Sequence, residues 1–396
     1  MHEQTWQNRI TRFLTAQAIS LLGSSIVSFA IIWYITLETS SGVMLMYSTI
    51  ATFVPQIFVS LFAGVLLDRY NRKYLIMVSD TLIALTTLIL FFIVRAGDPS
   101  MTLLFVALAI RSIGTGVQNP AVNAVIPQLI PESELMRING FFVSMTSLIA
   151  FLAPALAASV LGWLGLAPAL LVDMSTALIG VGITATVFFP PLRHTEEEAT
   201  SSIQGLKDAF AYLRTHPFLK RLFLFEGTIL FLFSPLFMLA LIVERTFGGS
   251  YWQLAATEVS FGIGAIIGGV FIGWWGGFAN RMTTVLMSAL ILGVLMFLLG
   301  LAPFWVFVAL LFVWGIFNPT YDTPFITLLQ ERVEPDMHGR IFGFLQIVIA
   351  ASLPLGMILF GPLGDIVRVE TLFLTSGVLI VGWTAMGRYV LKLEQV

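Results

Sequence analysis

The sequence contains no cysteine, and only 11% of its 396 residues are charged. Without cysteine, disulfides, thiolate metal sites and thiol nucleophiles are all excluded. Soluble globular proteins carry about 25% charged residues, so a folded surface of this composition is poorly suited to water. The 20 lysine and arginine residues are balanced by 22 aspartate and glutamate residues, which leaves no basic face for nucleic acid.

Apolar residues are in excess, at 58% of the chain. They form continuous runs of about 20 residues, the length of a membrane-crossing helix, whereas strands of a membrane barrel alternate apolar and polar residues. We therefore predict an all-α polytopic membrane protein with twelve transmembrane helices. The expected spans are 11–36, 43–67, 75–94, 101–126, 139–162, 166–189, 219–243, 253–276, 283–300, 304–329, 340–362 and 370–390.

The orientation of these spans follows from the basic residues in the connections. The first apolar run is longer than the core of a signal peptide and lacks an A-x-A pattern, so we expect it to be retained as a span. Sixteen lysine and arginine residues fall on the side that holds both termini, and three fall on the other. The positive-inside rule then predicts a multi-pass protein of the plasma (cytoplasmic) membrane with both termini in the cytoplasm.

The two halves of the chain repeat each other. The Asn-Pro pair at 119–120 recurs at 318–319, and the Ala-Pro pair at 153–154 matches Leu-Pro at 353–354. Parallel repeats of this kind are typical of one large class of transporters, in which the substrate site lies near the midplane between the halves. The predicted domains are an N-terminal six-helix half at 1–189, a cytoplasmic linker at 190–218 and a C-terminal six-helix half at 219–396.

Several motifs resemble one known family. The segment GVLLDRYNRK at 64–73 resembles the G-x-x-x-D-R-x-G-R-K signature of the major facilitator superfamily, with Asn71 in a glycine position. Segments 110–116, 119–131 and 257–269 resemble the macrolide-efflux branch of its drug:proton antiporters. Helix 5 has Ala-Pro-Ala-Leu-Ala-Ala at 153–158, which keeps the small residues of the antiporter motif G-P-x-x-G-G but not its glycines. The resemblance implies the major facilitator fold, two six-helix halves that work by alternating access.

We interpret the segment 64–73 as a cytoplasmic gate. Gly64 permits close helix approach, and Asp68 can face the positive N-terminal end of a helix in the other half. The resemblance implies that the aspartate of this motif helps to close the cytoplasmic side. An ordinary positively charged loop is the alternative interpretation. The predicted gate residues are Gly64, Asp68, Arg69, Arg72 and Lys73, together with Asp80, a few residues into helix 3.

Ionisable residues inside spans are expensive and are therefore candidates for function. Arg111 lies about ten residues into its span, near the bilayer midplane. The resemblance to the family implies that the sequence pattern around Arg111, in the fourth span, is linked to proton coupling. A salt bridge that fixes helix 4 is the alternative. Glu258, Asp173 and Glu226 lie deep in their spans, where the loss of hydration disfavours the charged form of a carboxyl group. Such a group can bind and release a proton during transport. Glu258 is the first choice as coupling acid, although a paired interfacial carboxylate is the alternative for each.

In the superfamily, the first, fourth, seventh and tenth spans line the central cavity, which here are 11–36, 101–126, 219–243 and 304–329. An apolar pocket with a few polar groups suits a hydrophobic or amphipathic, cationic ligand. For any single aromatic residue, however, packing or a lipid-facing position is the alternative. The predicted substrate-cavity residues are Gln17, Trp33, Asn119, Asn123, Phe231, Trp314, Asn318, Tyr321 and Asp322.

We expect no cofactor, no metal and no enzymatic activity. No G-x-x-x-x-G-K-[ST] loop is present, the four histidines are scattered, and the glycines at 262–269 are better explained by helix packing than by a dinucleotide loop. The predicted function is secondary active export of hydrophobic or amphipathic drugs, with macrolide-like antibiotics as substrates and protons as counter-ions, by a monomer. A siderophore or lipid exporter, an intramembrane enzyme, a passive channel and Na⁺ coupling are the alternatives.

Overall fold

The structure, a computed structural model, describes residues 5–97, 99–190 and 202–391. Within these ranges the regular structure is entirely helical. Twelve helical segments of the described chain are long and apolar enough to cross a membrane. The predicted all-α class and number of spans are confirmed. Such helices satisfy their own backbone hydrogen bonds, which a bilayer interior requires.

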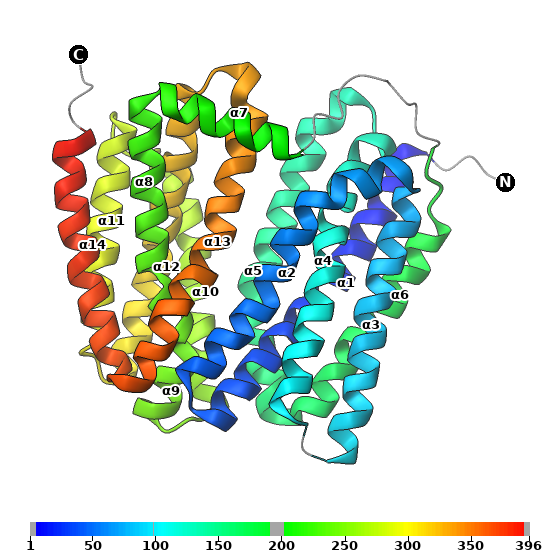
Figure 1. The fold of residues 1–396 in the computed structure, drawn as a ribbon, viewed down its shortest axis with the longest axis horizontal. Coiled ribbons are helices and arrows are strands. Elements are labelled where there is room, and N and C mark those ends of the chain that lie inside the picture. Colours follow the sequence, from blue (N-terminus) through cyan, green and yellow to red (C-terminus); the bar gives the residue numbers. More distant parts are fainter. Residues whose placement is uncertain (1–4, 98, 191–201, 392–396) are drawn as a thin grey trace. The chain divides into compact units, whose positions relative to one another are not determined.

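The chain folds into two compact units, and the first comprises residues 1–35 and 47–202. In this unit α3 packs against both α4 and α6. One hydrophobic core of this unit joins Phe13 of the first helix to Ile76 and Val125 of two later helices. The elements are α1 (Trp6–Thr39), α2 (Gly42–Arg69), α3 (Arg72–Ala96), α4 (Met101–Leu129), η1 (Glu132–Glu134), α5 (Leu135–Leu164) and α6 (Leu166–Thr186) (Figure 1).

The second unit comprises residues 36–46 and 203–396 and repeats the first. Its α11 packs against α12 and α14, as α3 packs against α4 and α6. A short 3₁₀ turn precedes α13, just as η1 precedes α5. The two-half pseudo-repeat is therefore confirmed. From residue 217 onward the elements are α8 (Pro217–Leu232), η2 (Ser234–Met238), α9 (Leu239–Phe247), α10 (Tyr251–Trp275), α11 (Arg281–Leu299), α12 (Phe304–Arg332), η3 (Pro335–Met337), α13 (His338–Ile366) and α14 (Val369–Leu391).

The seventh span differs from the continuous helix expected at 219–243. It is built from α8, the 3₁₀ segment η2 and α9, with the interruption at Ser234 and Pro235. Proline has no N–H group to continue the α-helical ladder, and it disfavours the α conformation of the residue before it. Prolines inside α4 and α12, by contrast, leave those helices continuous.

Glycines bring α10 and α12 into close contact. A Cβ atom added to Gly268 would lie 2.7 Å from the Cα of Ile316 and nearer still to its carbonyl oxygen. Gly264 faces the carbonyl oxygen of Phe312 and Gly315 faces that of Phe261 in the same way. Close backbone approach through small residues is the usual packing of membrane helices. Gly264 and Gly268 of the cluster 262–269 thus serve helix packing, as expected, whereas Gly269 has no neighbour within 4 Å of its Cβ position.

Residues 36–46 form the turn between α1 and α2, and they belong to the second unit. The carboxylate of Asp365 accepts hydrogen bonds from the backbone N–H groups of Gly42 at 2.7 Å and Val43 at 2.9 Å. It therefore caps the N-terminus of α2, where backbone donors have no partner within the helix. Arg245 forms an ion pair with the same carboxylate at 2.6 Å.

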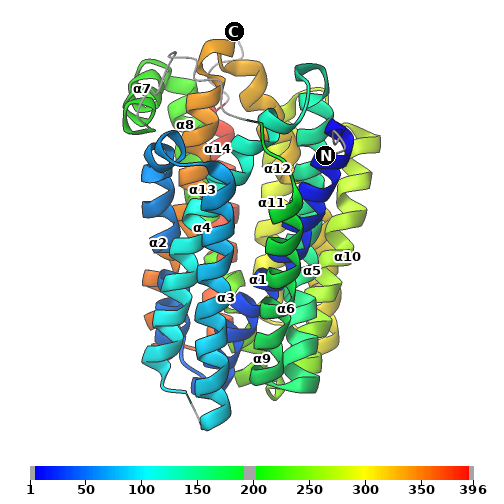
Figure 2. The same cartoon turned by 90° about the vertical axis from the view of Figure 1, so that its right-hand side faces the viewer.

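The segment predicted as a linker contains a helix. Of residues 190–218, those from 191 to 201 lie outside the described residues, and α7 (Ser202–Thr215) follows them. Asp208 of α7 pairs with Arg340 of α13 at 3.6 Å. The hydroxyl of Tyr212 accepts a 3.4 Å hydrogen bond from the backbone N–H of Glu334. These contacts hold α7 near the turn between α12 and α13 (Figure 2).

Candidate functional site: buried charges and a polar recess

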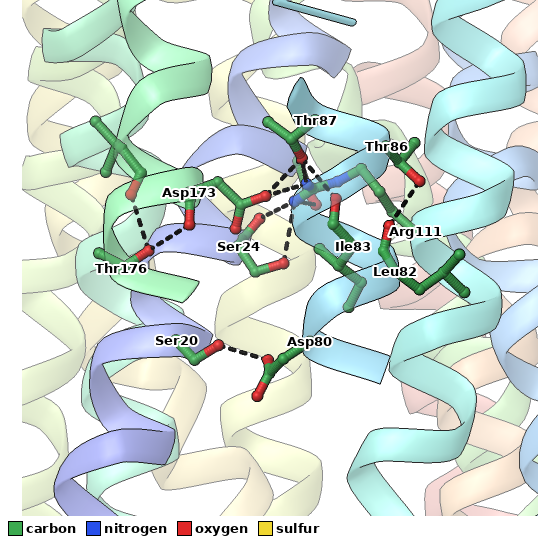
Figure 3. Close-up of polar contacts among 12 residues, drawn as sticks. Ser20, Ser24, Asp80, Leu82, Ile83, Thr86, Thr87, Arg111, Asp173 and Thr176 are labelled. Atoms are coloured by element: carbon green, nitrogen blue, oxygen red, sulfur yellow. Dashed lines mark hydrogen bonds and ion pairs between the residues drawn. The ribbon is translucent and has the colours of Figure 1, made fainter. Parts of the chain in front are cut away.

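Arg111 lies in the middle of α4 and is 2% exposed. Its guanidinium group forms an ion pair with Asp173 of α6 and a hydrogen bond to Thr87 of α3 (Figure 3). Thr87 and Asp173 also contact each other, with 2.6 Å between the hydroxyl and a carboxylate oxygen. Two residues predicted separately, Arg111 and Asp173, are thus one ion pair.

The other side of the guanidinium group faces α1. One terminal nitrogen donates to the carbonyl oxygen of Ser24 at 2.9 Å and to its hydroxyl at 3.0 Å, and the hydroxyl of Ser28 lies 3.4 Å away. A buried charge is tolerated only when it is paired and its donors are satisfied. Arg111 meets both conditions except at Nε, which is buried without a partner. The site therefore connects α1, α3, α4 and α6 through one side chain.

Asp80 occupies a second buried position in the first unit, next to the Arg111 site. One carboxylate oxygen accepts a hydrogen bond from Ser20 of α1 at 2.6 Å (Figure 3). The same oxygen accepts a second hydrogen bond from Gln118 of α4 at 2.7 Å. The other carboxylate oxygen is buried without a hydrogen-bond partner in the described structure. From its position in the sequence, Asp80 is predicted to belong to the gate with segment 64–73, but its observed partners come from α1 and α4 instead.

The gate segment 64–73 crosses the turn from α2 to α3. Asn71, in the glycine position of the signature, accepts a 3.0 Å hydrogen bond from the N–H of Lys73 and so caps α3. Arg72 donates to the carbonyl oxygen of Ala124 at 2.7 Å, and Lys73 donates to that of Val187 at 2.7 Å. Both cations thus bind backbone carbonyl groups within their own unit. Arg69 is exposed and Gly64 half-buried, and the Asp68 side chain lies outside the described part.

A recess of about 200 Å³ opens in the first unit between α1, α2 and α4. Arg111 forms part of its wall, and most of the other lining side chains are neutral and polar, among them Ser25, Gln56 and Gln118. The cavity residues predicted in this unit lie elsewhere. Gln17 and Trp33 are buried, and Asn119 and Asn123 are exposed.

In the second unit one predicted residue of α8 contacts one predicted residue of α12. Glu226 is buried, and the hydroxyl of Tyr321 donates a hydrogen bond to its carboxylate. Asp322 is next in sequence and accepts a 2.9 Å hydrogen bond from Asn318. Phe233 packs against the ring of Trp314 at 5.1 Å between centroids.

Two further predicted residues of this unit lie apart from Glu226. Phe231 packs against Phe360 of α13, with 5.6 Å between the ring centroids. Glu258 of α10 is half-buried, and no described residue forms a hydrogen bond or an ion pair with it. Among the described residues, no group of three or more histidine, aspartate or glutamate side chains is arranged to hold a metal ion.

Most of the chain matches one known protein family. The model of the Major Facilitator Superfamily matches residues 13–274 and residues 236–395. The chain belongs to the major facilitator superfamily. Macrolide efflux protein A of Streptococcus pyogenes is 30% identical over 381 residues, which cover 95% of this chain and 94% of that protein.

Two further similarities are weaker. The multidrug efflux pump Tap of Mycobacterium tuberculosis is 25% identical over 391 residues, 93% of this chain and 90% of that protein. The crystal structure of the nucleoside transporter NupG matches with a TM-score of 0.74 at 16% identity and covers 99% of this chain and 100% of that one. The latter similarity concerns the fold alone. A member of this superfamily is a multi-pass membrane transporter, so the buried charges described above lie within transmembrane helices.

The sequence did not identify every residue of the Arg111 site. Thr87, which contacts both members of the ion pair, is one of several threonines in an apolar helix and carries no motif. Gln118, which links the recess to Asp80, adjoins the Asn-Pro pair without being part of it. Only their position beside a buried charge distinguishes them from other polar residues of the same spans.

Proposed function

We propose that this transporter is a secondary active exporter of hydrophobic or amphipathic drugs, with macrolide-like antibiotics as substrates and protons as counter-ions. The similarity to macrolide efflux protein A over 95% of the chain supports the substrate class. The observation that carries the coupling is the Arg111–Asp173 pair, whose side chains are 3% and 1% exposed. Because one such charge costs about 2.5–3.5 kcal/mol at the centre of a bilayer helix, a role beyond packing explains its presence.

Glu258 remains the first proposed carrier of the exchanged proton. It has no ion-pair or hydrogen-bond partner among the described residues, so it can gain or lose a proton without breaking a contact. Asp173 would first have to release Arg111, and Glu226 would have to release Tyr321. These two acids therefore follow Glu258, and Arg111 serves by controlling the charge of Asp173.

The test is drug accumulation by purified protein in liposomes with an imposed pH gradient. Glu258→Gln should still bind drug but should no longer accumulate it, because glutamine imitates the neutral state and cannot cycle. Asp173→Asn and Glu226→Gln are measured in parallel, and Glu331→Gln is the matched control because Glu331 is 52% exposed at the end of α12. A sodium gradient without a pH gradient tests the alternative ion.

Each outcome has a defined consequence. If Glu258→Gln still concentrates drug while one of the other two variants does not, the proton carrier is that other residue. If all three variants remain coupled to the pH gradient, the carrier lies outside these helices. If the unmodified protein accumulates no drug under either gradient, the proposal of secondary active drug export is wrong.

We further propose that the halves 1–189 and 219–396 alternate around the substrate in a monomer, with residues 190–218 as the cytoplasmic linker. Asp68 and Arg72 would act at the cytoplasmic gate. The absence of cysteine makes the topology testable, because a single introduced thiol is the only one to react. In intact cells, Leu301→Cys should react with an impermeant maleimide, and Lys207→Cys should react only after permeabilisation. The reverse pattern would overturn the orientation.

A further inference from the structure

The recess between α1, α2 and α4 has an unusual lining for a protein that is 58% hydrophobic. Ligand sites are mostly apolar with a few polar groups, and here most of the surface that faces the recess is apolar while polar side chains outnumber apolar ones among the lining residues. Its volume of about 200 Å³ is also smaller than the roughly 300 Å³ at which drug-sized pockets begin. The recess therefore has room for one substituent of a large ligand and offers it both apolar surface and hydrogen-bonding groups.

Several hydroxyl groups in the lining are already engaged with the backbone. The hydroxyl of Thr52 donates to the carbonyl oxygen of Ser48 at 2.8 Å, and that of Thr115 donates to the carbonyl oxygen of Arg111 at 3.1 Å. Ser112 donates to the carbonyl oxygen of Thr52 at 2.6 Å. These groups fix the wall of the recess and have little capacity left for a ligand.

Other side chains in the lining retain their hydrogen-bonding capacity. The hydroxyl of Ser25 and the side-chain amide of Gln56 form no hydrogen bond with the described residues. Gln118 uses its N–H group on Asp80, which leaves its carbonyl oxygen as an acceptor. Polar groups in such a position need a partner from water or from a ligand. Together they offer donors and acceptors from three helices around one small volume.

The charge balance indicates a neutral ligand group. Arg111 contributes to the wall, but its positive charge is matched by Asp173, so the pair offers no excess charge to an anion. Phe29 and Phe53 complete the lining with apolar ring faces. A group that has hydroxyls around its edge and apolar C–H faces, as a sugar ring has, matches both kinds of surface.

We infer that this recess binds a hydroxyl-rich, neutral ring substituent, such as a sugar, of the exported compound. The inference rests on the proposed drug export and adds a determinant of specificity to it. A glycosylated macrolide should therefore bind more tightly than its aglycone, the same ring without sugars. Two hydrogen bonds of ordinary strength correspond to a preference of about tenfold.

The experiment measures the affinity of both compounds for the full-length protein in lipid nanodiscs that are free of glycoside detergents, which carry sugars themselves. Ser25→Ala combined with Gln56→Leu should weaken binding of the glycosylated macrolide about tenfold and leave the aglycone unchanged. Thr52→Val is the matched control, because it removes a hydroxyl that is engaged with its own helix. Equal thermal denaturation curves show that the variants are folded.

The results separate this inference from the proposed function. If the double variant binds both compounds as the unmodified protein does, or if the unmodified protein prefers the aglycone, the sugar site is wrong while drug export stands. If Thr52→Val lowers the preference as much as the double variant does, the effect is one of helix packing and the inference also fails. If neither compound is accumulated by liposomes under a pH gradient, the proposed function itself fails.

Discussion

Removing the carboxylate of Asp173 while Arg111 remains is expected to leave an uncompensated charge among four helices. The side chains of the pair are 3% and 1% exposed, so water cannot take the place of the lost partner. Breaking such a buried pair costs about 3–5 kcal/mol, and a central arginine in a bilayer costs about 2.5–3.5 kcal/mol. We therefore expect Asp173→Leu to lower the free energy of unfolding by about 3 kcal/mol, a change of about 100-fold in the unfolding equilibrium.

A double-mutant cycle makes this expectation specific to the pair. Arg111→Met added to Asp173→Leu should restore most of the lost stability, because an apolar pair of similar size carries no desolvation cost. Arg111→Lys keeps the charge but not the planar group that contacts Asp173, Thr87 and Ser24, so it should lose less stability than Arg111→Ala and retain some transport.

The assay is equilibrium unfolding in mixed micelles, together with drug transport by the same variants. The double variant should be folded and inactive, which separates a role in coupling from a role in packing. The reasoning is refuted if Asp173→Leu costs less than about 1 kcal/mol, or if the double variant is no more stable than the single one. It is also refuted if the folded double variant transports drug at the normal rate.

Other substitutions test the helix contacts and the gate. Gly268→Ala should reduce thermal stability and yield because its Cβ atom would meet the backbone of α12. Gly269→Ala should be neutral or slightly stabilising, because nothing lies within 4 Å of its Cβ position. Equal melting temperatures of the two variants would contradict the close contact. Asp365→Ala should lower the free energy of unfolding by about 1 kcal/mol, because it removes the cap of α2 and a partly exposed ion pair with Arg245. An unchanged free energy of unfolding would show that the cap contributes nothing. Asp68→Asn, chosen from the sequence motif, should strongly reduce transport at normal abundance, and normal efflux would remove Asp68 from the gate.

The sequence by itself determined the spans, because a helix in a bilayer satisfies its backbone hydrogen bonds internally and its hydropathy is a local property. The repeated Asn-Pro pair and the match of Ala-Pro with Leu-Pro likewise indicated two similar halves, which the recurring 3₁₀ turns η1 and η3 reproduce. Local capping chemistry also explains why Asn71 is acceptable in a glycine position, since its side chain caps α3. The spans and the cap depend on residues that lie close together in the chain, and the repeat is visible because short motifs recur about 200 residues later.

The tertiary structure decided which polar groups meet. Arg111 pairs with Asp173, 62 residues away, because α3 packs against both α4 and α6, and no pattern along the chain encodes that choice of neighbours. Asp80 lies a few residues from the gate motif in the sequence, yet it bonds to α1 and α4 because its side chain points into the unit. Hydropathy fixes the depth of a residue in the bilayer, but its partner depends on how neighbouring helices are rotated and packed.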